Sequence, residues 1–365
     1  MPAPSLALRT HPWLTSLKAA QLQRLARATG VQSSGTRAAL IERVGDVLRG
    51  HERESATGLE NSAQDELGSG RGETGARCAT QKTRRVLSID MGVRNFAFAH
   101  FRVQAGGTGT CAPELMAWRR LAVSDIGELE TGVEPESESE ADVNQDRDLG
   151  LDKEVATSDN KYQPHIYAAT AYTLISTLLA TYRPTHILIE RQRFRSGGSK
   201  AVLEWSLRVG VLEGMLHAVL HALRAERAEM ARVCVHGVEP NRVVRYWADN
   251  VHTSGSGLEI ASGKISPRQL KKAKIDLVGR WLDGSTGAGA EPGKVVVGSD
   301  PAVRDLVDGY VRKWKSPRSR SPGVLSAGKV DDLADCLLQG MTWLEWQATR
   351  DKLAREGEKA LTSIL

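Results

Sequence analysis

The sequence lacks the features that mark membrane proteins and disulfide-rich secreted proteins. It contains no run of about 18 or more apolar residues, so a membrane-spanning helix is excluded. Its only cysteines, Cys78, Cys111, Cys234 and Cys336, lie far apart and form no CxxC pair. A zinc site or a disulfide framework is therefore not expected, and a reducing compartment fits this cysteine content better.

Acidic charge is concentrated in one segment. Between Glu128 and Glu154 there are eleven acidic and two basic residues, a local charge of −9. Since the whole chain carries +5, the remainder carries +14. The segment 128–160 is predicted to be a disordered acidic insertion. A basic body of this kind suggests a polyanionic partner such as nucleic acid.

The 365 residues leave room for one to three domains. Composition and periodicity predict four parts: a helical module (1–48), a flexible polar linker (49–84), an α/β domain (85–345) and a helical tail (346–365). Residues 284–328 are predicted to be mostly loop, because they are rich in Gly, Pro and Ser.

The α/β domain opens with two alternating strands around a Gly turn (85–103) and continues with strands and helices in turn. The later elements expected are a helix (164–182), the strand HILIE, a long helix (199–226), the strand VCVHGV, a basic helix (267–283) and a last helix from about 330. This order predicts a mixed sheet flanked by helices.

The amino-terminal module is predicted to be a pair of short helices. Their apolar faces are formed by Leu17, Leu22 and Leu25 on the first helix and Leu40, Ile41 and Val44 on the second. The string LKAAQLQRLARATGVQSSGTRAALIERV resembles the SAP motif, a small DNA-binding module. The resemblance implies that the second helix, with Arg37 in its first turn, faces the phosphate backbone, as free N–H groups at a helix start also favour. The alternative is a helical hairpin that contacts other proteins.

Five acidic residues stand at unusual places in the α/β domain. Asp90 ends the apolar strand VLSID, Glu190 ends HILIE, and VDDLADCLLQG carries Asp331, Asp332 and Asp335 on one helix. Each acid alone has an ordinary structural explanation, as a cap or an ion pair. Asp335 lies three or four residues after the other two helix acids, so it shares a helical face with either of them. Together with the two strand-end acids, the helix acids predict a carboxylate site for Mg²⁺ or Mn²⁺. Two such ions about 4 Å apart can activate water for phosphodiester cleavage.

Three blocks carry a resemblance to a known family. SIDMGVRNFAFAH, ILIERQRFRSGGSKAVLEWSLRVGVLEGML and KVDDLADCLLQG resemble the fungal mitochondrial cruciform-cutting endonucleases, relatives of bacterial RuvC. The resemblance covers about residues 85–345 and implies an RNase H-like α/β fold that resolves four-way (Holliday) junctions. The implied catalytic and metal-binding residues are Asp90, Glu190, Asp331, Asp332 and Asp335. RuvC-type enzymes favour Asp332 with Asp335, but the choice between Asp331 and Asp332 stays open.

Basic residues follow Glu190 and recur on the basic helix. The candidates for DNA contact are Arg191, Gln192, Arg193, Arg195 and Lys200 in the loop, and Lys271, Lys272 and Lys274 on the helix. Gln192 suits a base, a sugar or a backbone group equally. The alternative for the helix is an ordinary solvated face.

The expected partner is four-way junction DNA, with no membrane and no small-molecule substrate. A homodimer is expected because two opposed strands must be cut and one acidic site positions one phosphate. The resemblance implies a mitochondrial location, in the matrix or nucleoid. Two other classes are an ATPase of the actin or sugar-kinase type, which would need a second Gly-rich phosphate loop, and a non-catalytic SAP-type DNA-binding scaffold.

Overall fold

The computed structural model describes residues 11–65, 83–104, 112–123, 162–192, 204–254, 266–286, 294–317 and 327–365. The chain divides into two compact units. The sheet unit comprises Lys82–Glu239 and Ser266–Gly340, and the helical unit comprises Met1–Gln81, Pro240–Ile265 and Met341–Leu365. The predicted acidic insertion (128–160) lies outside the described residues. None of the described helices is long and apolar enough to span a membrane.

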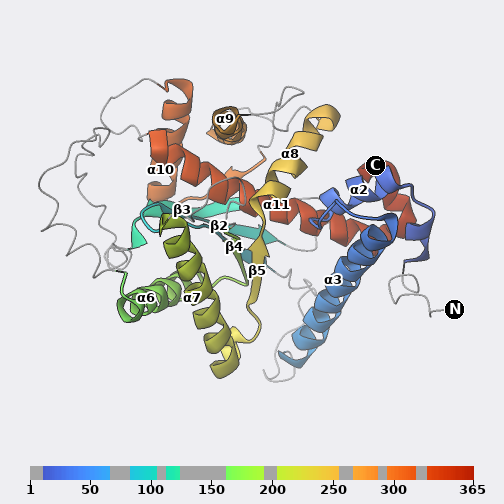
Figure 1. Ribbon diagram of the computed structural model, residues 1–365, viewed down its shortest axis with the longest axis horizontal. Helices are drawn as coiled ribbons and strands as arrows, with labels where there is room; N and C mark the ends of the chain where they lie inside the picture. The colour runs from blue at the N-terminus through green and yellow to red at the C-terminus, as the bar shows by residue number, and fades with distance from the viewer. Residues whose placement is uncertain are drawn as a thin grey trace, which may run out of the picture. The chain divides into compact units, whose positions relative to one another are not determined.

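A six-stranded mixed sheet forms the centre of the sheet unit (Figure 1). Its strands are β1 (Thr83–Asp90), β2 (Phe96–Gln104), β3 (Glu114–Leu121), β4 (His186–Glu190), β5 (Cys234–Val238) and β6 (Val296–Val297). Their order across the sheet is β5-β4-β1-β2-β3-β6. Strand β2 runs antiparallel to both β1 and β3, whereas β4 is parallel to β1 and β5, and β6 is parallel to β3. The mixed sheet predicted from the order of elements is confirmed.

One face of the sheet packs against α6 (Pro164–Tyr182) and α7 (Glu204–Glu226). Alternate residues of β1 and β4, such as Leu87 and Ile187, point into this core because successive side chains of a strand alternate between faces. A stripe on α7 meets them, with buried leucines spaced three or four residues apart. The stripe consists of Leu212, Leu216, Leu220 and Leu223. A short 3-10 turn (Ala228–Met230) leads from α7 to β5.

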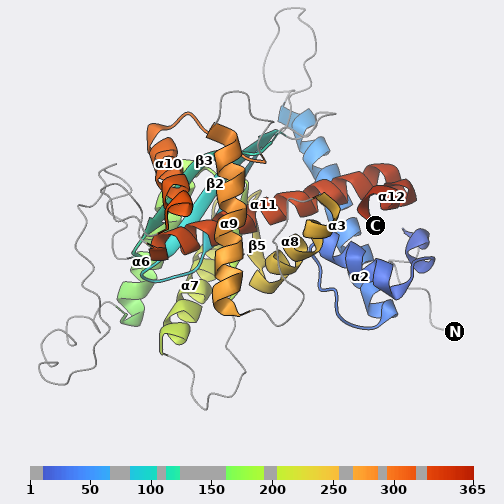
Figure 2. The ribbon, with the colours of Figure 1, turned by 90° about the horizontal axis from the view of Figure 1, so that it is seen from above.

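The opposite face carries α9 (Pro267–Thr286), α10 (Pro301–Lys315) and the first half of α11 (Ala327–Glu356) (Figures 1 and 2). Gln339 Nε2 fastens α11 to β1 by donating to Ser88 Oγ (3.1 Å) and to the carbonyl of Ile89 (3.0 Å). A Cβ on Gly340 would collide with the ring of Phe101, so glycine permits the close approach of α11 to β2.

The helical unit contains the amino-terminal module and the chain's carboxyl end. Its elements are a 3-10 turn (Pro12–Thr15), α2 (Ala19–Ala28), α3 (Arg37–Asp65), α8 (Pro240–Ser254), the second half of α11, a second 3-10 turn (Gly357–Ala360) and α12 (Leu361–Ile364). The predicted apolar faces of the first two helices form its core together with Leu353 and Leu361. Gly30 has φ 73° and lies against Trp346, where a side chain would be both strained and crowded.

Several boundaries differ from the sequence-based expectation. Helix α3 continues to Asp65, so the first part of the predicted linker is helical. The predicted boundary at 345/346 falls inside α11, and α8 belongs to the helical unit. The loop prediction for 284–328 is wrong at β6 and α10. Helix α10 forms because Asp300 caps it by accepting from Ala302 N (2.9 Å) and a stripe with Val303, Val307 and Tyr310 is buried.

Candidate active site

The two strand-end acids lie side by side. In the parallel pairing of β1 with β4, Ile89 is opposite Ile189, so the next residues, Asp90 and Glu190, meet at the carboxyl edge of the sheet. The backbone N–H of Met91 donates to Glu190 Oε2 (3.4 Å). The structure thus brings together two acids that are a hundred residues apart in the chain.

The first turns of α11 bring the helix acids to the same edge. The indole Nε1 of Trp118 donates to the carbonyl of Leu333 (3.0 Å), in the middle of the acidic motif. Gln339 holds the helix two turns further on, at the strand that ends in Asp90. These contacts place Asp335 and Asp332 within electrostatic range of Asp90, and Asp331 within range of Asp335.

Burial and mutual repulsion raise the pKa values of these carboxyl groups. Burial is the largest cause for Asp90, and the negative charges of Glu190, Asp335 and Asp332 raise its pKa further, well above the ordinary value. The pKa of Asp335 is raised to about 6 by burial, although Lys274 opposes the shift. Such a cluster is costly for the fold and favourable for a cation, because a bound positive charge would reverse the repulsion.

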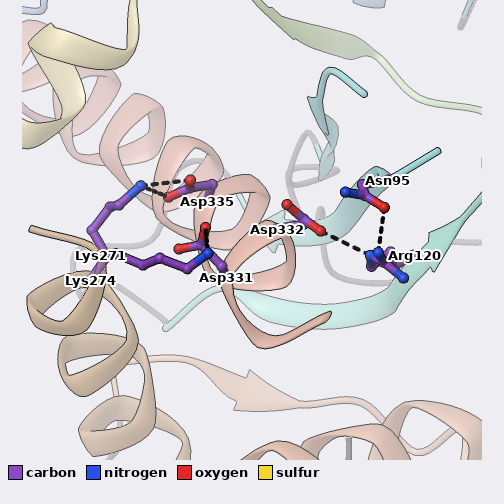
Figure 3. A network of polar contacts seen from close by, with 7 residues as sticks. All are labelled: Asn95, Arg120, Lys271, Lys274, Asp331, Asp332 and Asp335. Atoms are coloured by element: carbon purple, nitrogen blue, oxygen red, sulfur yellow. Dashed lines mark hydrogen bonds and ion pairs between the residues drawn. The ribbon is translucent and has the colours of Figure 1, made fainter. Parts of the chain in front are cut away.

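Two lysines of α9 supply positive charge to this cluster (Figure 3). Lys274 Nζ lies 2.6 Å from Asp335 Oδ2, and Lys271 Nζ lies 2.7 Å from Asp331 Oδ2. These lysines and Lys272 are the residues of α9 predicted to contact DNA, and that contact stays a prediction. In the structure Lys271 and Lys274 contact the acids and Lys272 is exposed. Helix α9 is held over this edge by its packing on α10, where Trp314 Nε1 donates to Asp276 Oδ1 (3.1 Å).

Asp331 and Asp332 point to different surroundings (Figure 3). Asp332 Oδ2 accepts from Arg120 Nε (2.8 Å), and Arg120 also donates to Asn95 Oδ1. Asp331 lies on the lysine side with Asp335, and its second oxygen, Oδ1, is buried without a hydrogen-bond partner among the described residues. An unsatisfied buried carboxylate oxygen is costly unless a cation binds it.

The segment after Glu190 is described only in part. Arg193, Arg195 and Lys200 lie outside the described residues. Gln192 Nε2 donates to Glu190 Oε2 (3.3 Å), while its backbone N–H donates to Glu213 Oε2 (3.0 Å). Gln192 therefore contacts the strand-end carboxylate, and its DNA contact stays a prediction. The aliphatic part of Arg191 covers Gly237 on the neighbouring strand.

Arg37, in the helical unit, is exposed but hydrogen-bonded within its own module. It donates to the backbone carbonyls of Leu17 (3.1 Å) and Thr15. The hydroxyl of Thr36 caps the same helix start by accepting from Ala39 N (3.3 Å). The predicted helix start is present, and Arg37 links it to the segment that precedes α2.

Sequence analysis misses several residues that shape the site. Arg120, Asn95, Glu213 and Gln339 hold the acids or their elements in place. Arg120 lies on β3, whose sequence ELMAWRRL does not predict a strand because it mixes charged and apolar residues irregularly. The partners of Asp332 and Glu190 follow from strand pairing and helix packing, and spacing along the chain carries no signal for them.

The donor set fits a hard divalent cation. All the converging groups are carboxylates, the ligands that Mg²⁺ and Mn²⁺ prefer. The orphaned Oδ1 of Asp331 and the raised pKa values of Asp90 and Asp335 indicate that Lys271 and Lys274 compensate the acidic cluster only in part. The residues present therefore fit the metal site predicted from the sequence.

A mixed sheet in this strand order, with acids at the ends of β1 and β4 and on a helix across them, defines the RNase H-like class of folds. Residues 86–353 match the family described as mitochondrial resolvase Ydc2 / RNA splicing MRS1, and the chain belongs to this family. Residues 13–44 match the SAP domain. The SAP resemblance and the family resemblance predicted from the sequence are thereby confirmed.

Named relatives agree with this assignment. The chain is 27% identical to the mitochondrial cruciform cutting endonuclease 1 of Schizosaccharomyces pombe over 268 residues, 73% of this chain and 80% of the relative. It is 22% identical to the Saccharomyces cerevisiae protein of the same name, over 72% and 68% of the two chains. The crystal structure of the yeast mitochondrial Holliday junction resolvase Ydc2 aligns with a TM-score of 0.51 at 21% identity, covering 95% of this chain and 99% of that one, which supports the fold.

Proposed function

We propose that this chain is an endonuclease that resolves four-way DNA junctions by metal-dependent hydrolysis, with cuts on two opposed strands. The observation that carries the proposal is the convergence of the carboxylates of Asp90, Glu190 and Asp335 from three elements, beside the orphaned Oδ1 of Asp331. The family membership and the matched SAP domain favour DNA as the substrate.

The residues divide into ligands and positioning groups. Asp90, Glu190, Asp335 and Asp331 would hold two Mg²⁺ or Mn²⁺ ions. Gln192 orients Glu190, and Arg120 holds Asp332 away from the lysine side, so both are positioning residues. Bound ions would neutralise the scissile phosphate and acidify the attacking water. The raised pKa of Asp90 favours the neutral carboxyl group while no cation is bound, and a bound ion would favour its ionised form.

The lysines of α9 link the acids to the substrate. Lys271 and Lys274 compensate Asp331 and Asp335 while no cation is bound. If divalent ions neutralised those acids, the two ammonium groups would be available to the DNA phosphates beside the cut. In this role the lysines contact DNA as the sequence predicts, but only in the metal-bound enzyme.

A homodimer would place two such sites across a junction of approximate twofold symmetry. Helix α7 supports this proposal, because Leu207 and Val211 are 48% and 47% exposed on its outer side while its leucine stripe fills the core. Exposed apolar side chains of this size on one helix suit an isologous contact. Leu207→Asp with Val211→Asp should convert a dimer to a monomer in sedimentation analysis, whereas His217→Asp on the same helix should not.

The SAP domain is proposed to add affinity for duplex arms, and the protein is proposed to act in mitochondria, in the matrix or nucleoid. Arg37→Ala should weaken duplex binding modestly, because this arginine holds the helix start that faces DNA. Deleting residues 1–80 is a poorer test, since it would strip the core partners of Leu353 and Leu361. A fluorescent fusion co-stained with mitochondrial DNA tests the location.

Cleavage of an end-labelled four-way junction with Mg²⁺, beside a linear duplex of the same sequence and an ATP hydrolysis assay, tests the main proposal. Two symmetric cuts in the junction and none in the duplex are expected. Ca²⁺ should support binding without cutting, because its looser coordination suits the reaction poorly. ATP hydrolysis without cleavage would favour the ATPase alternative, and binding alone would favour a scaffold.

Asp331→Asn and Asp332→Asn separate the two candidate ligands. If Asp331 holds an ion, Asp331→Asn should abolish cleavage at all Mg²⁺ concentrations. Asp332→Asn should leave partial activity, because it disturbs the Arg120 contact and leaves the ligand set intact. The reverse order of effects would assign the metal to Asp332.

A further inference from the structure

A second group of potential metal ligands lies in the sheet unit, at the end of β4 opposite Glu190. His186, Cys234 and His236 each offer one ligand atom, and these atoms all lie within 4.8 Å of one another. All three residues are partly buried. We propose that these residues form a tetrahedral Zn²⁺ site that fastens β5 to β4.

Strand pairing explains why these three side chains meet. His186 is directly opposite Cys234 in the parallel ladder, and adjacent strands lie about 4.8 Å apart. His236 is two residues beyond Cys234, so alternation places it on the same face of the sheet. The rings of His186 and His236 lie nearly parallel, with centroids 5.9 Å apart and an interplanar angle of 10°.

A neighbouring threonine prepares His186 to act as a ligand. Thr185 Oγ1 accepts from the backbone N–H of Arg85 (2.9 Å) and donates its single proton to the carbonyl of the same residue (3.0 Å). Its remaining contact, with His186 Nδ1 at 2.9 Å, is then satisfied when Nδ1 carries the proton. This tautomer leaves the lone pair on Nε2, and metal-bound histidines commonly donate their other ring N–H in this way.

The donor chemistry selects the ion. Two imidazole nitrogens and a thiolate suit Zn²⁺ and are poor ligands for Mg²⁺. Water would complete the four-coordinate site, and the Cys234 thiol would release its proton to solvent on binding. Among the described strands β5 is the outermost and pairs with β4 alone, so a shared ion would hold an edge strand that is hydrogen-bonded on one side. The site is separate from the catalytic one, since His186 and Glu190 are about 13 Å apart along an extended strand.

Titration of the metal-stripped full-length protein with Co²⁺ tests the proposal, because a cobalt–thiolate bond gives a charge-transfer band that carboxylate sites cannot produce. The band should saturate at one ion per chain and disappear when Zn²⁺ is added. Cys234→Ser and His236→Gln should each remove it. Asp90→Asn, which alters the carboxylate site, and His221→Ala, on exposed helix surface, should retain it.

Circular dichroism of each variant separates loss of the site from loss of the fold. A wild-type protein without the band, or a band that persists in Cys234→Ser, would overturn the proposal. The same holds if a folded His236→Gln protein binds Co²⁺ with unchanged affinity. Junction cleavage is not the readout, so this result is independent of the proposed nuclease activity.

Discussion

The two ends of β4 carry opposite kinds of donor on one face of the same strand. Glu190 ends the strand among carboxylates, which are hard oxygen ligands, whereas His186 begins it beside a thiol and a second imidazole. At the Glu190 end, like charges repel and lysines compensate them. At the His186 end, neutral groups gather at little electrostatic cost. A single strand can therefore present two sites with different ion preferences, because each end meets different neighbours.

The largest expected effect is the loss of junction cleavage when the carboxylate cluster at the Glu190 end of β4 is altered. Asp90→Asn should reduce junction cleavage by more than the roughly 100-fold that losing a hydrogen bond to a metal ligand costs. It should also raise the Tm, since one repelling carboxylate is removed from the cluster. Single-turnover cleavage and thermal unfolding measure both effects. Junction binding in Ca²⁺ serves as the control, and an Asp90→Asn protein that cuts at the wild-type rate would place the catalytic centre elsewhere.

A smaller loss should follow from removing the group that orients Glu190. Gln192→Ala should lower cleavage by about 10- to 100-fold at limiting Mg²⁺, because the Glu190 carboxylate loses one of its two donors and keeps only the Met91 N–H among the described residues. Excess Mg²⁺ should restore much of the rate, which distinguishes a positioning residue from a DNA contact. Lys272→Ala, on the exposed side of α9, is the matched control for DNA binding. A Gln192→Ala defect that depends on salt and not on Mg²⁺ would support the DNA contact predicted from the sequence.

The sequence predicts a group of acidic residues at the Glu190 end of β4. It does not predict the His186, Cys234 and His236 cluster at the other end. An apolar strand that ends in an acid, as VLSID and HILIE do, is visible without the fold, and so is an acidic helix start. The cysteine spacing predicts no zinc site, because Cys234 meets His186 only through the pairing of β4 with β5. Similarly, Lys274 looks like part of a solvated basic face until α9 is packed over the acids.

Long-range packing also explains the elements that sequence analysis misses. Helix α10 lies in a Gly/Pro/Ser-rich region, where composition suggests loop, but Val303, Val307 and Tyr310 form a buried stripe. The helical unit gathers segments from both ends of the chain, since Arg350 donates to the carbonyl of Thr29 (2.7 Å). Local patterns identify the first two helices but cannot reveal which distant segment completes their core.

The close packing of α11 against β2 predicts an effect of substitution at Gly340 on stability. Gly340→Ala should lower the free energy of unfolding by about 1–3 kcal/mol, because the new methyl group collides with Phe101. Gly214→Ala is the matched control on α7, where nothing lies within 4 Å. It should stabilise the protein by about 0.5–1 kcal/mol through helix propensity. Urea unfolding measures both, and equal losses for the two variants would mean that α11 does not approach β2 closely.

The smallest expected effect concerns the buried His100 and the dependence of stability on pH. His100 is 6% exposed, and neither ring nitrogen has a partner among the described residues. Burial, assisted by Arg85 and Arg102, lowers its pKa to about 4. In the unfolded chain His100 is protonated as the pH falls below about 6.5, whereas in the folded chain it is protonated only near pH 4. The free energy of unfolding therefore falls as the pH drops through this window. Between pH 6.5 and 5.5 the loss should be about 1 kcal/mol.

Urea unfolding at the two pH values measures this loss, and His100→Leu should reduce the pH dependence by that amount. Zn²⁺ should not alter the His100 contribution, because this ring packs against Tyr182 at a tilt of 47° (centroids 5.2 Å apart) and belongs to no group of three or more potential metal ligands among the described residues. If His100→Leu left the pH dependence unchanged, the proton uptake would belong to another group.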